Sequence, residues 1–194
     1  MDKLQIILSN AKVILTPLRY EDESLLQPIA AEKELWTYGL QDLSQPQELT
    51  NYMKEAIIAR EAGTCAIWLV TDAASDRVAG CTRLFAIDWK NRRGEIGATW
   101  LGAHYRGTGL NRAMKYLILQ YGFETLNLNR IELKADERNL RSRKAIAGIG
   151  AIEEGTLRQH MITHNGYIRN TVYYSILQSE WPQVKNKYFA DYLI

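Results

Sequence analysis

The sequence predicts an α/β protein in which a mixed sheet carries helices on its faces. Strand-like segments form a meander in the middle of the chain, and strand, helix, strand, helix and a final hairpin follow. This order is typical of a mixed sheet covered by helices. The 194 residues are 46% hydrophobic and 10% aromatic, a composition that suits one folded domain with a sizeable core.

Hydrophobic periodicity and turn residues place the elements of the first half of the chain. In order, we expect a strand over 13–19, a helix over 21–34, a helix over 46–62, and strands over 65–72 and 77–87. The first of these helices has an acid-rich first turn, and the second ends at Gly63; both are usual features of helix boundaries. A turn at 91–94 then leads into the next strand.

The second half contains the clearest strand–helix unit. We expect, in order, a strand over 95–101, a helix over 109–124, a strand over 130–135, a short helix within 136–151, a hairpin turn at 165–166 and a strand over 171–176. No linker or repeat interrupts this order. The sequence therefore predicts a single domain over residues 1–194, with a core from about 13 to 182 and a C-terminal tail over 183–194.

The charge balance indicates which partners to expect. With 24 basic and 22 acidic residues the net charge is only +2, so neither nucleic acid nor a membrane is an expected partner, and an anion must be bound locally. The apolar run at 6–8 is too short for a secretory core or a membrane span, which predicts a cytoplasmic location. Cys65 and Cys81 lie in apolar strand-like runs and the three histidines are scattered, so buried thiols and no metal site are expected.

The loop Arg106–Asn111 joins the strand over 95–101 to the following helix and contains Gly107 and Gly109. Unpaired N–H groups and the positive end of the dipole make a helix N-terminus favourable for an anion. Glycines let the backbone approach the anion without a Cβ in between. The loop is predicted to hold a phosphate group; a plain glycine turn between strand and helix is the alternative.

Two common nucleotide loops do not match. A P-loop requires Lys and then Ser or Thr after the last glycine, and Leu110 and Asn111 occupy those positions. The dinucleotide fingerprint requires Gly-x-Gly-x-x-Gly, and Gly107, Gly109 and Ala113 do not keep that spacing. What remains is an Arg-x-x-Gly-x-(Gly/Ala) pattern that starts at Arg106, with Asn111 at its last position.

A second strand after this loop leads to Asn139, and Gly150 follows eleven residues later. Downstream lie Glu154–Met161, the Asn165-Gly166 turn, the strand over 171–176 and Ser179–Pro182. Loop and downstream segments together resemble the GNAT acetyltransferase superfamily, and in particular its Rim-type branch, which includes the ribosomal-protein N-terminal acetyltransferases. The resemblance extends from about Val13 to Pro182.

The resemblance implies the GNAT acyl-CoA N-acyltransferase fold: a central, mostly antiparallel sheet with helices on both faces, in which two parallel central strands splay apart and admit the thioester arm of the cofactor. It implies acetyl-CoA as acyl donor and no metal. The cofactor-binding residues that it implies are Trp100, Leu101, Arg106, Gly107, Thr108, Gly109, Leu110, Asn111, Asn139 and Ser142. Asn111 stands where the family usually has Gly or Ala, although similar Rim-type members carry Asn there.

Direct acyl transfer to an amine needs donors for the developing oxyanion and a proton for the departing thiolate. The oxyanion contact is expected from backbone N–H groups near Thr99, Trp100 and Leu101. Many GNAT members place a tyrosine acid where this chain has Ile146. Ser142 is the residue that the Rim-type resemblance places near the CoA sulfur; a helix-start serine that stabilises the first turn is the alternative.

The reaction also needs a base for the amine, and the sequence offers Glu95 and His160, with Glu154 as a third candidate. Burial of Glu95 would raise the pKa of its carboxyl toward a useful value; the alternative is an exposed strand-end acid paired with Arg92 or Arg93. The resemblance places His160 in the segment that enters the acceptor groove, and imidazole suits proton transfer near neutral pH. A structural role for His160 is the alternative.

The acceptor is expected to be a primary amine, and the resemblance favours the α-amine at a protein N-terminus. Trp36, Tyr38 and Tyr167 come from segments that line the acceptor side in this family, although they could equally be core or surface aromatics. A small-molecule amine or a longer acyl donor are the first alternatives. A non-catalytic module that binds acyl-CoA or a partner is the second, and both a monomer and a homodimer are compatible with the sequence.

Overall fold

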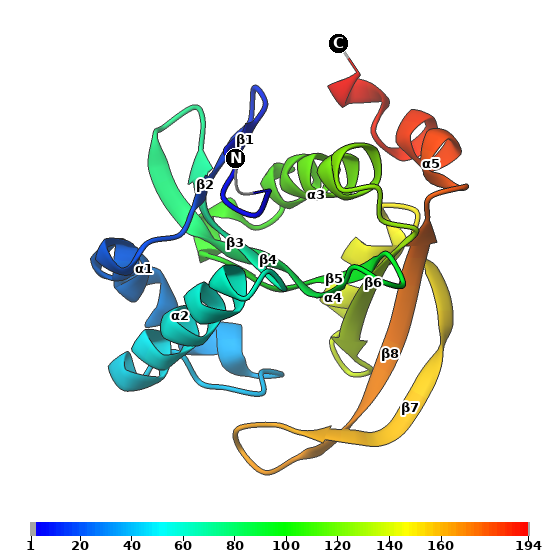
Figure 1. Ribbon diagram of the computed structural model, residues 1–194. Helices are drawn as coiled ribbons and strands as arrows, with labels where there is room; N and C mark the ends of the chain where they lie inside the picture. Colours follow the sequence, from blue (N-terminus) through cyan, green and yellow to red (C-terminus); the bar gives the residue numbers. More distant parts are fainter. Residues whose placement is uncertain (1–2, 194) are drawn as a thin grey trace.

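All strands belong to one eight-stranded sheet with the order β1-β2-β3-β4-β5-β6-β8-β7 (Figure 1). The computed structural model describes residues 3–193. The strands are β1 Leu8–Ser9, β2 Val13–Pro17, β3 Ala66–Asp72, β4 Arg77–Asp88, β5 Arg93–Leu101, β6 Arg130–Asp136, β7 Ile152–Ile162 and β8 Ile168–Leu177. Neighbouring strands are antiparallel except for β5 and β6, which are parallel. The predicted mixed and mostly antiparallel sheet is confirmed.

The parallel strands β5 and β6 separate soon after they start. They pair only at Arg93–Arg130, Gly94–Ile131 and Glu95–Glu132. Beyond these residues β5 stays paired with β4, and β6 stays paired with β8 as far as Asp136. The two edges that face each other therefore have no strand partner, and their backbone polar groups border an opening in the middle of the sheet.

A β-bulge bends β5 beside this opening. The register between β4 and β5 shifts between Cys81 and Arg83, and Ala98 has a left-handed φ of 46°. The Tyr52 hydroxyl donates a hydrogen bond to the Ala98 carbonyl oxygen over 3.2 Å, which holds the unusual backbone in place. Bulges increase the local bend of a strand, so this one helps β5 to turn away from β6.

Helices cover both faces of the sheet (Figure 1). They are α1 Glu23–Ala30, α2 Pro46–Glu61, α3 Leu110–Gln120, α4 Leu140–Ala147 and α5 Trp181–Tyr188. One face buries α3, α4 and α5 around residues such as Met114, Ile146 and Phe189. The opposite face buries α1 and α2 around Leu26, Met53 and Trp100. The opening between β5 and β6 thus lies between two packed layers.

Several helices differ in extent from the sequence-based expectation. The helix expected over 21–34 is shorter, because single 3₁₀ turns at Tyr20–Asp22 and Lys33–Trp36 flank α1. The helix expected over 109–124 ends as α3 at Gln120 and continues as a π-helical turn over Tyr121–Thr125. The helix expected within 136–151 begins only after Asn139, whose side chain caps α4.

The C-terminal segment is integrated into the core. Residues after Pro182 complete α5 and a 3₁₀ turn at Ala190–Tyr192. Val184 and Phe189 are buried, and Phe189 packs against Tyr116 of α3 with a ring-centroid distance of 5.5 Å. Arg112 of α3 donates to the Tyr188 carbonyl oxygen. This segment therefore packs against α3 through Tyr116 and Arg112.

Replacing Phe189 by Ala should lower the free energy of unfolding by about 3 to 5 kcal/mol, because it empties a fully buried aromatic site. Urea denaturation followed by circular dichroism measures the change. Asn186→Ala, at an exposed position of the neighbouring helix α5, serves as the control and should change the free energy by less than about 0.5 kcal/mol. Equal effects of the two substitutions would show that the segment adds nothing to the core.

Candidate active site

A cavity of about 620 Å³ occupies the opening between β5 and β6. Its walls come from the unpaired edges of both strands, from α3 and α4, from the segment between α1 and α2, and from β7. At one end it reaches the loop at Arg106 and Gly107, and at another it reaches Glu95 and His160. The split in the sheet therefore connects the predicted phosphate loop with the predicted acid–base residues.

The loop before α3 has the geometry of an anion cradle. Gly107 and Gly109 have left-handed φ values of 79° and 90°, which other residues adopt only with strain. Gly109 is the N-cap of α3 and has no side chain to cap it, while the Leu110 N–H donates to the neighbouring Thr108 hydroxyl over 3.4 Å. The first backbone N–H groups of α3 are therefore free of intrahelical partners, and the positive end of the helix dipole lies beside them.

Two side chains around the cradle lie far away in the sequence. The Nζ of Lys12 lies 3.3 Å from the point that a Cβ on Gly109 would occupy, so a cation stands at the loop. Arg106 donates to Glu32 over 2.8 Å and to the Leu101 carbonyl oxygen over 2.9 Å. Arg106 thus braces the loop, and its charge is partly neutralised by Glu32. Lys12 and Glu32 carry no local sequence signal, because only the fold brings them here.

Helix α4 begins at the cavity, directly after Asn139. The Asn139 Oδ1 atom accepts the backbone N–H of Ser142 over 3.0 Å and so caps the helix. Asn139, Ser142 and Ile146 all line the cavity. The cap thereby fixes the backbone of Ser142 at the opening, and the apolar Ile146 lies one turn further along the same helix.

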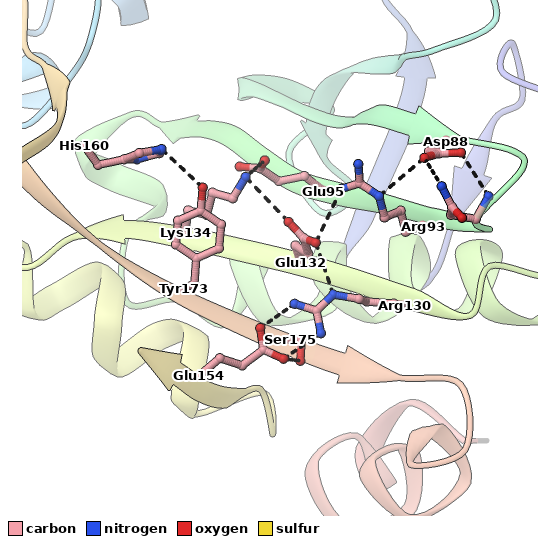
Figure 2. A network of polar contacts seen from close by, with 11 residues as sticks. Asp88, Arg93, Glu95, Arg130, Glu132, Lys134, Glu154, His160, Tyr173 and Ser175 are labelled. Atoms are coloured by element: carbon pink, nitrogen blue, oxygen red, sulfur yellow. Dashed lines mark hydrogen bonds and ion pairs between the residues drawn. The ribbon is translucent and has the colours of Figure 1, made fainter. Parts of the chain in front are cut away.

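Glu95 lies inside the network of charges shown in Figure 2. Its side chain is only 13% exposed, and Oε2 lies 2.7 Å from the Lys134 Nζ. Burial raises the pKa of the Glu95 carboxyl, and the hydrogen bond and charge of Lys134 oppose that rise. Glu95 is therefore not an exposed strand-end acid paired with Arg92 or Arg93. Its ion-pair partner is Lys134 of the neighbouring strand.

His160 stands at the end of the same network (Figure 2). Its Nε2 lies 3.5 Å from the Tyr173 hydroxyl, and the Lys134 Nζ lies 4.5 Å from the centre of the Tyr173 ring. Both Glu95 and His160 line the cavity. Glu154 instead pairs with Arg130 and Ser175, which lowers the pKa of its carboxyl to about 2. Glu154 is thus a poor base at neutral pH.

The residues expected at the oxyanion lie on the unpaired edge of β5. Thr99, Trp100 and Leu101 line the cavity. The Trp100 side chain packs into the α1–α2 layer against Trp36, with ring centroids 5.5 Å apart. The Thr99 hydroxyl lies 2.7 Å from the Thr82 hydroxyl and accepts a hydrogen bond from Lys115 over 2.8 Å. Both threonine hydroxyls are therefore already engaged.

Lys115 is a cavity residue that the sequence reasoning missed. It lies on α3, and only 6% of it is exposed. Its position in the helix could have indicated that it is buried. Residues 111, 115, 118 and 122 lie on one side of the helix, and Ile118 and Gly122 on that side are buried.

The aromatic residues expected on the acceptor side divide into two groups. Trp36 and Tyr38 line the cavity. Tyr167 lies outside it and stacks on Arg138, whose guanidinium carbon is 3.5 Å from the ring centre. Arg138 is itself paired with Asp136 over 2.7 Å. Of these three aromatic residues, Trp36 and Tyr38 therefore border the cavity and Tyr167 does not.

Both cysteines are free and buried, as predicted, and burial raises the pKa of each thiol to about 11. Within residues 3–193 no group of His, Cys, Asp or Glu side chains could hold a metal ion. No helix in this range is long and apolar enough to cross a bilayer.

Comparison with known sequences and structures gives a consistent picture. Residues 12–152 match the family model described as an acetyltransferase (GNAT) domain. The chain is 37% identical over 106 residues to the Bacillus subtilis (strain 168) protein named "Putative ribosomal N-acetyltransferase YdaF"; the match spans 55% of this chain and 57% of that protein. It is 31% identical over 103 residues to the spermidine N(1)-acetyltransferase of Escherichia coli (strain K12), covering 53% of this chain and 54% of that enzyme.

Solved structures show the same fold. A GCN5-related N-acetyltransferase from Brucella melitensis superposes with a TM-score of 0.85 at 29% identity, covering 96% of this chain and 85% of the other. Mycobacterium smegmatis RimJ, solved in complex with CoA-disulfide, superposes with a TM-score of 0.82 at 20% identity, covering 93% and 91%. The matched family model spans the cradle, the split strands and α4. The chain belongs to the GNAT family of acetyltransferases.

Proposed function

We propose that this protein transfers an acetyl group from acetyl-CoA to a primary amine by direct attack within a ternary complex. The observation that carries the proposal is the cavity between β5 and β6, which joins the cradle before α3 to the Glu95–Lys134 pair. The pyrophosphate would bind the α3 N-terminus with Lys12 beside it, and the thioester arm would lie along the unpaired edge of β5. Asn139 and Ser142 would border that arm from α4.

The charge of the cavity supports a polyanionic donor. Five cationic side chains and two carboxylates line it: Arg106, Lys115, Lys134, Arg141 and Arg169, with Glu95 and Asp136. Both carboxylates already have cationic partners, Lys134 and Arg138. A net basic cavity favours the phosphates of CoA and disfavours an acceptor that carries several positive charges.

The acceptor amine must lose a proton, and Glu95 is the base that the geometry favours. Its carboxylate is buried beside the opening, with a raised pKa and with Lys134 holding its position. It would take the proton directly or through a water molecule. His160 is more exposed and would instead orient the acceptor at the mouth of the cavity, next to Tyr173.

Among amines, we favour the α-amine of a protein N-terminus. The similarity to a protein named for ribosomal N-acetylation supports this choice, and so does the scarcity of unpaired carboxylates in the cavity. The similarity to a spermidine N(1)-acetyltransferase supports the second candidate, a small polyamine. A longer acyl donor and a non-catalytic acyl-CoA-binding role are the remaining alternatives.

Lys12→Glu should weaken binding of acetyl-CoA about tenfold, which corresponds to about 1.4 kcal/mol, because it places a negative charge beside the pyrophosphate. A thermal-shift titration with acetyl-CoA, CoA and ATP measures binding; ligand at about 100 times its dissociation constant stabilises the fold by about 2.7 kcal/mol. Lys54→Glu makes the same charge change at an exposed site on α2 and should bind like the wild type. If the melting temperature of the wild type did not rise with acetyl-CoA or CoA, or rose equally with ATP, the proposal would be contradicted.

Glu95→Gln should lower kcat by about a hundredfold or more, as expected for the loss of a general base, and should remove the acidic limb of the pH–rate profile. Glu95 is active when deprotonated, so the wild-type rate should fall as pH drops through its raised pKa. Glu132→Gln changes a carboxylate of the same network that does not line the cavity, and it should keep most of the activity. An acidic limb that survives in Glu95→Gln would exclude Glu95 as the base.

A panel of acceptors tests the substrate class. Release of CoA thiol should be fastest with peptides that carry a free N-terminal α-amine, slower with spermidine, and absent with N-terminally blocked peptides that lack lysine. The mass of the peptide product identifies the acylated nitrogen. Faster turnover with spermidine than with every peptide would favour the polyamine alternative, and turnover with no acceptor despite tight CoA binding would favour the non-catalytic one.

A further inference from the structure

Lys115 is a buried cation without an acidic partner. Its Nζ donates to the Thr99 hydroxyl over 2.8 Å, and among residues 3–193 no ion pair includes it. A buried ammonium without a carboxylate is costly, and an apolar side chain of similar length would pack there without that cost. Packing alone therefore does not account for a lysine at this position.

Burial lowers the pKa of the Lys115 ammonium to about 7, and no charged neighbour contributes to this shift. The groups that face Nζ are the hydroxyls of Thr99 on β5 and, behind it, Thr82 on β4. Neither hydroxyl titrates in this range. Near neutral pH the side chain can thus be either protonated or neutral, which is what proton transfer requires.

Lys115 and Glu95 reach the same cavity from opposite faces of the sheet. Glu95 lies on the face that α1 and α2 cover. A Cβ built on Gly97 would lie 3.4 Å from the Glu95 Oε1 and 3.0 Å from the Phe85 ring, and Phe85 packs in the α1–α2 layer. Lys115 reaches the cavity from α3, the helix that begins at the cradle. Proton removal from the acceptor and departure of the donor's thiol group would therefore take place on different sides of the opening.

The side of the opening next to the cradle lacks a strong acid on α4. Ser142 is a weak acid and Ile146 has no ionisable group, although both line the cavity. Lys115 lines the cavity next to the unpaired edge of β5, along which the thioester arm would lie. Its ammonium is the group on this side whose proton could neutralise a thiolate.

We propose, on the basis of the proposed acetyl transfer, that Lys115 donates the proton to the departing CoA thiolate. The amine nitrogen forms a bond to the thioester carbonyl carbon, and the carbon–sulfur bond breaks with its electron pair moving to sulfur. Sulfur takes a proton from the Lys115 Nζ, while the acetylated nitrogen loses one to Glu95 or water. Solvent then returns a proton to Lys115, so that amide and free CoA thiol are the only products.

Binding of CoA and of desulfo-CoA, which lacks the sulfur atom, tests this assignment without turnover. The wild type should bind CoA about tenfold or more tightly than desulfo-CoA at a pH near 7, where the Lys115 ammonium is populated and can stabilise the bound thiolate. In Lys115→Met the preference for CoA over desulfo-CoA should disappear, so that the two ligands bind alike. Calorimetric titration measures all four affinities.

The two possible failures are distinguishable. Equal loss of affinity for both ligands in Lys115→Met would assign Lys115 to the pantetheine arm and overturn the proton-donor role alone. Failure of the wild type to bind either ligand would overturn the proposed function and this inference with it. Thr99→Val removes the hydroxyl partner of Lys115 at similar volume, and it should keep a preference for CoA because the ammonium remains.

A measurement on the wild type alone covers the case in which Lys115→Met does not fold. Thiolate absorbance in the ultraviolet should show that the thiol of bound CoA titrates at a lower pH than that of free CoA. In the kinetics, kcat should fall as pH rises through the pKa of the Lys115 ammonium, because the donor must be protonated. A bound thiol that titrates at the same pH as free CoA would overturn the proposal.

Discussion

The site depends on one structural constraint, the early end of pairing between β5 and β6. Three residue pairs hold these strands together, and then each strand remains in the sheet through its other neighbour only. An unpaired backbone edge inside a sheet is unfavourable unless something hydrogen-bonds to it. The bulge at Ala98 bends β5 away from β6, and a ligand with amide groups could hydrogen-bond to the edge that is left unpaired.

Burial shifts the pKa values of two charged side chains beside this gap, Glu95 and Lys115. Glu95 is buried and is held by Lys134, so its carboxylate keeps a fixed position and a raised pKa. Lys115 is buried without a carboxylate, and its pKa is lowered to about 7. The two shifts bring an acid and an amine toward the same pH range from opposite directions. The paired carboxylates Glu95 and Asp136 leave the cavity net basic.

Features encoded in short stretches of sequence were predictable, and features created by distant contacts were not. The glycine loop at Gly107 and Gly109 has the left-handed backbone that its composition implies, and Asn139 starts α4 as the GNAT resemblance implies. Lys12 and Glu32 reach the cradle only through the fold. The ion-pair partner of Glu95 was not predictable from the sequence either, because Lys134 of β6 reaches it only through the strand register across a crossover.

The most direct test of this account is a crystal structure of the protein with acetyl-CoA bound. The account predicts the pyrophosphate against the N-terminus of α3 and the thioester between the unpaired edges of β5 and β6, with the sulfur on the side of Lys115 and Ser142. A cofactor bound elsewhere, or a thioester arm that does not enter the gap, would contradict it.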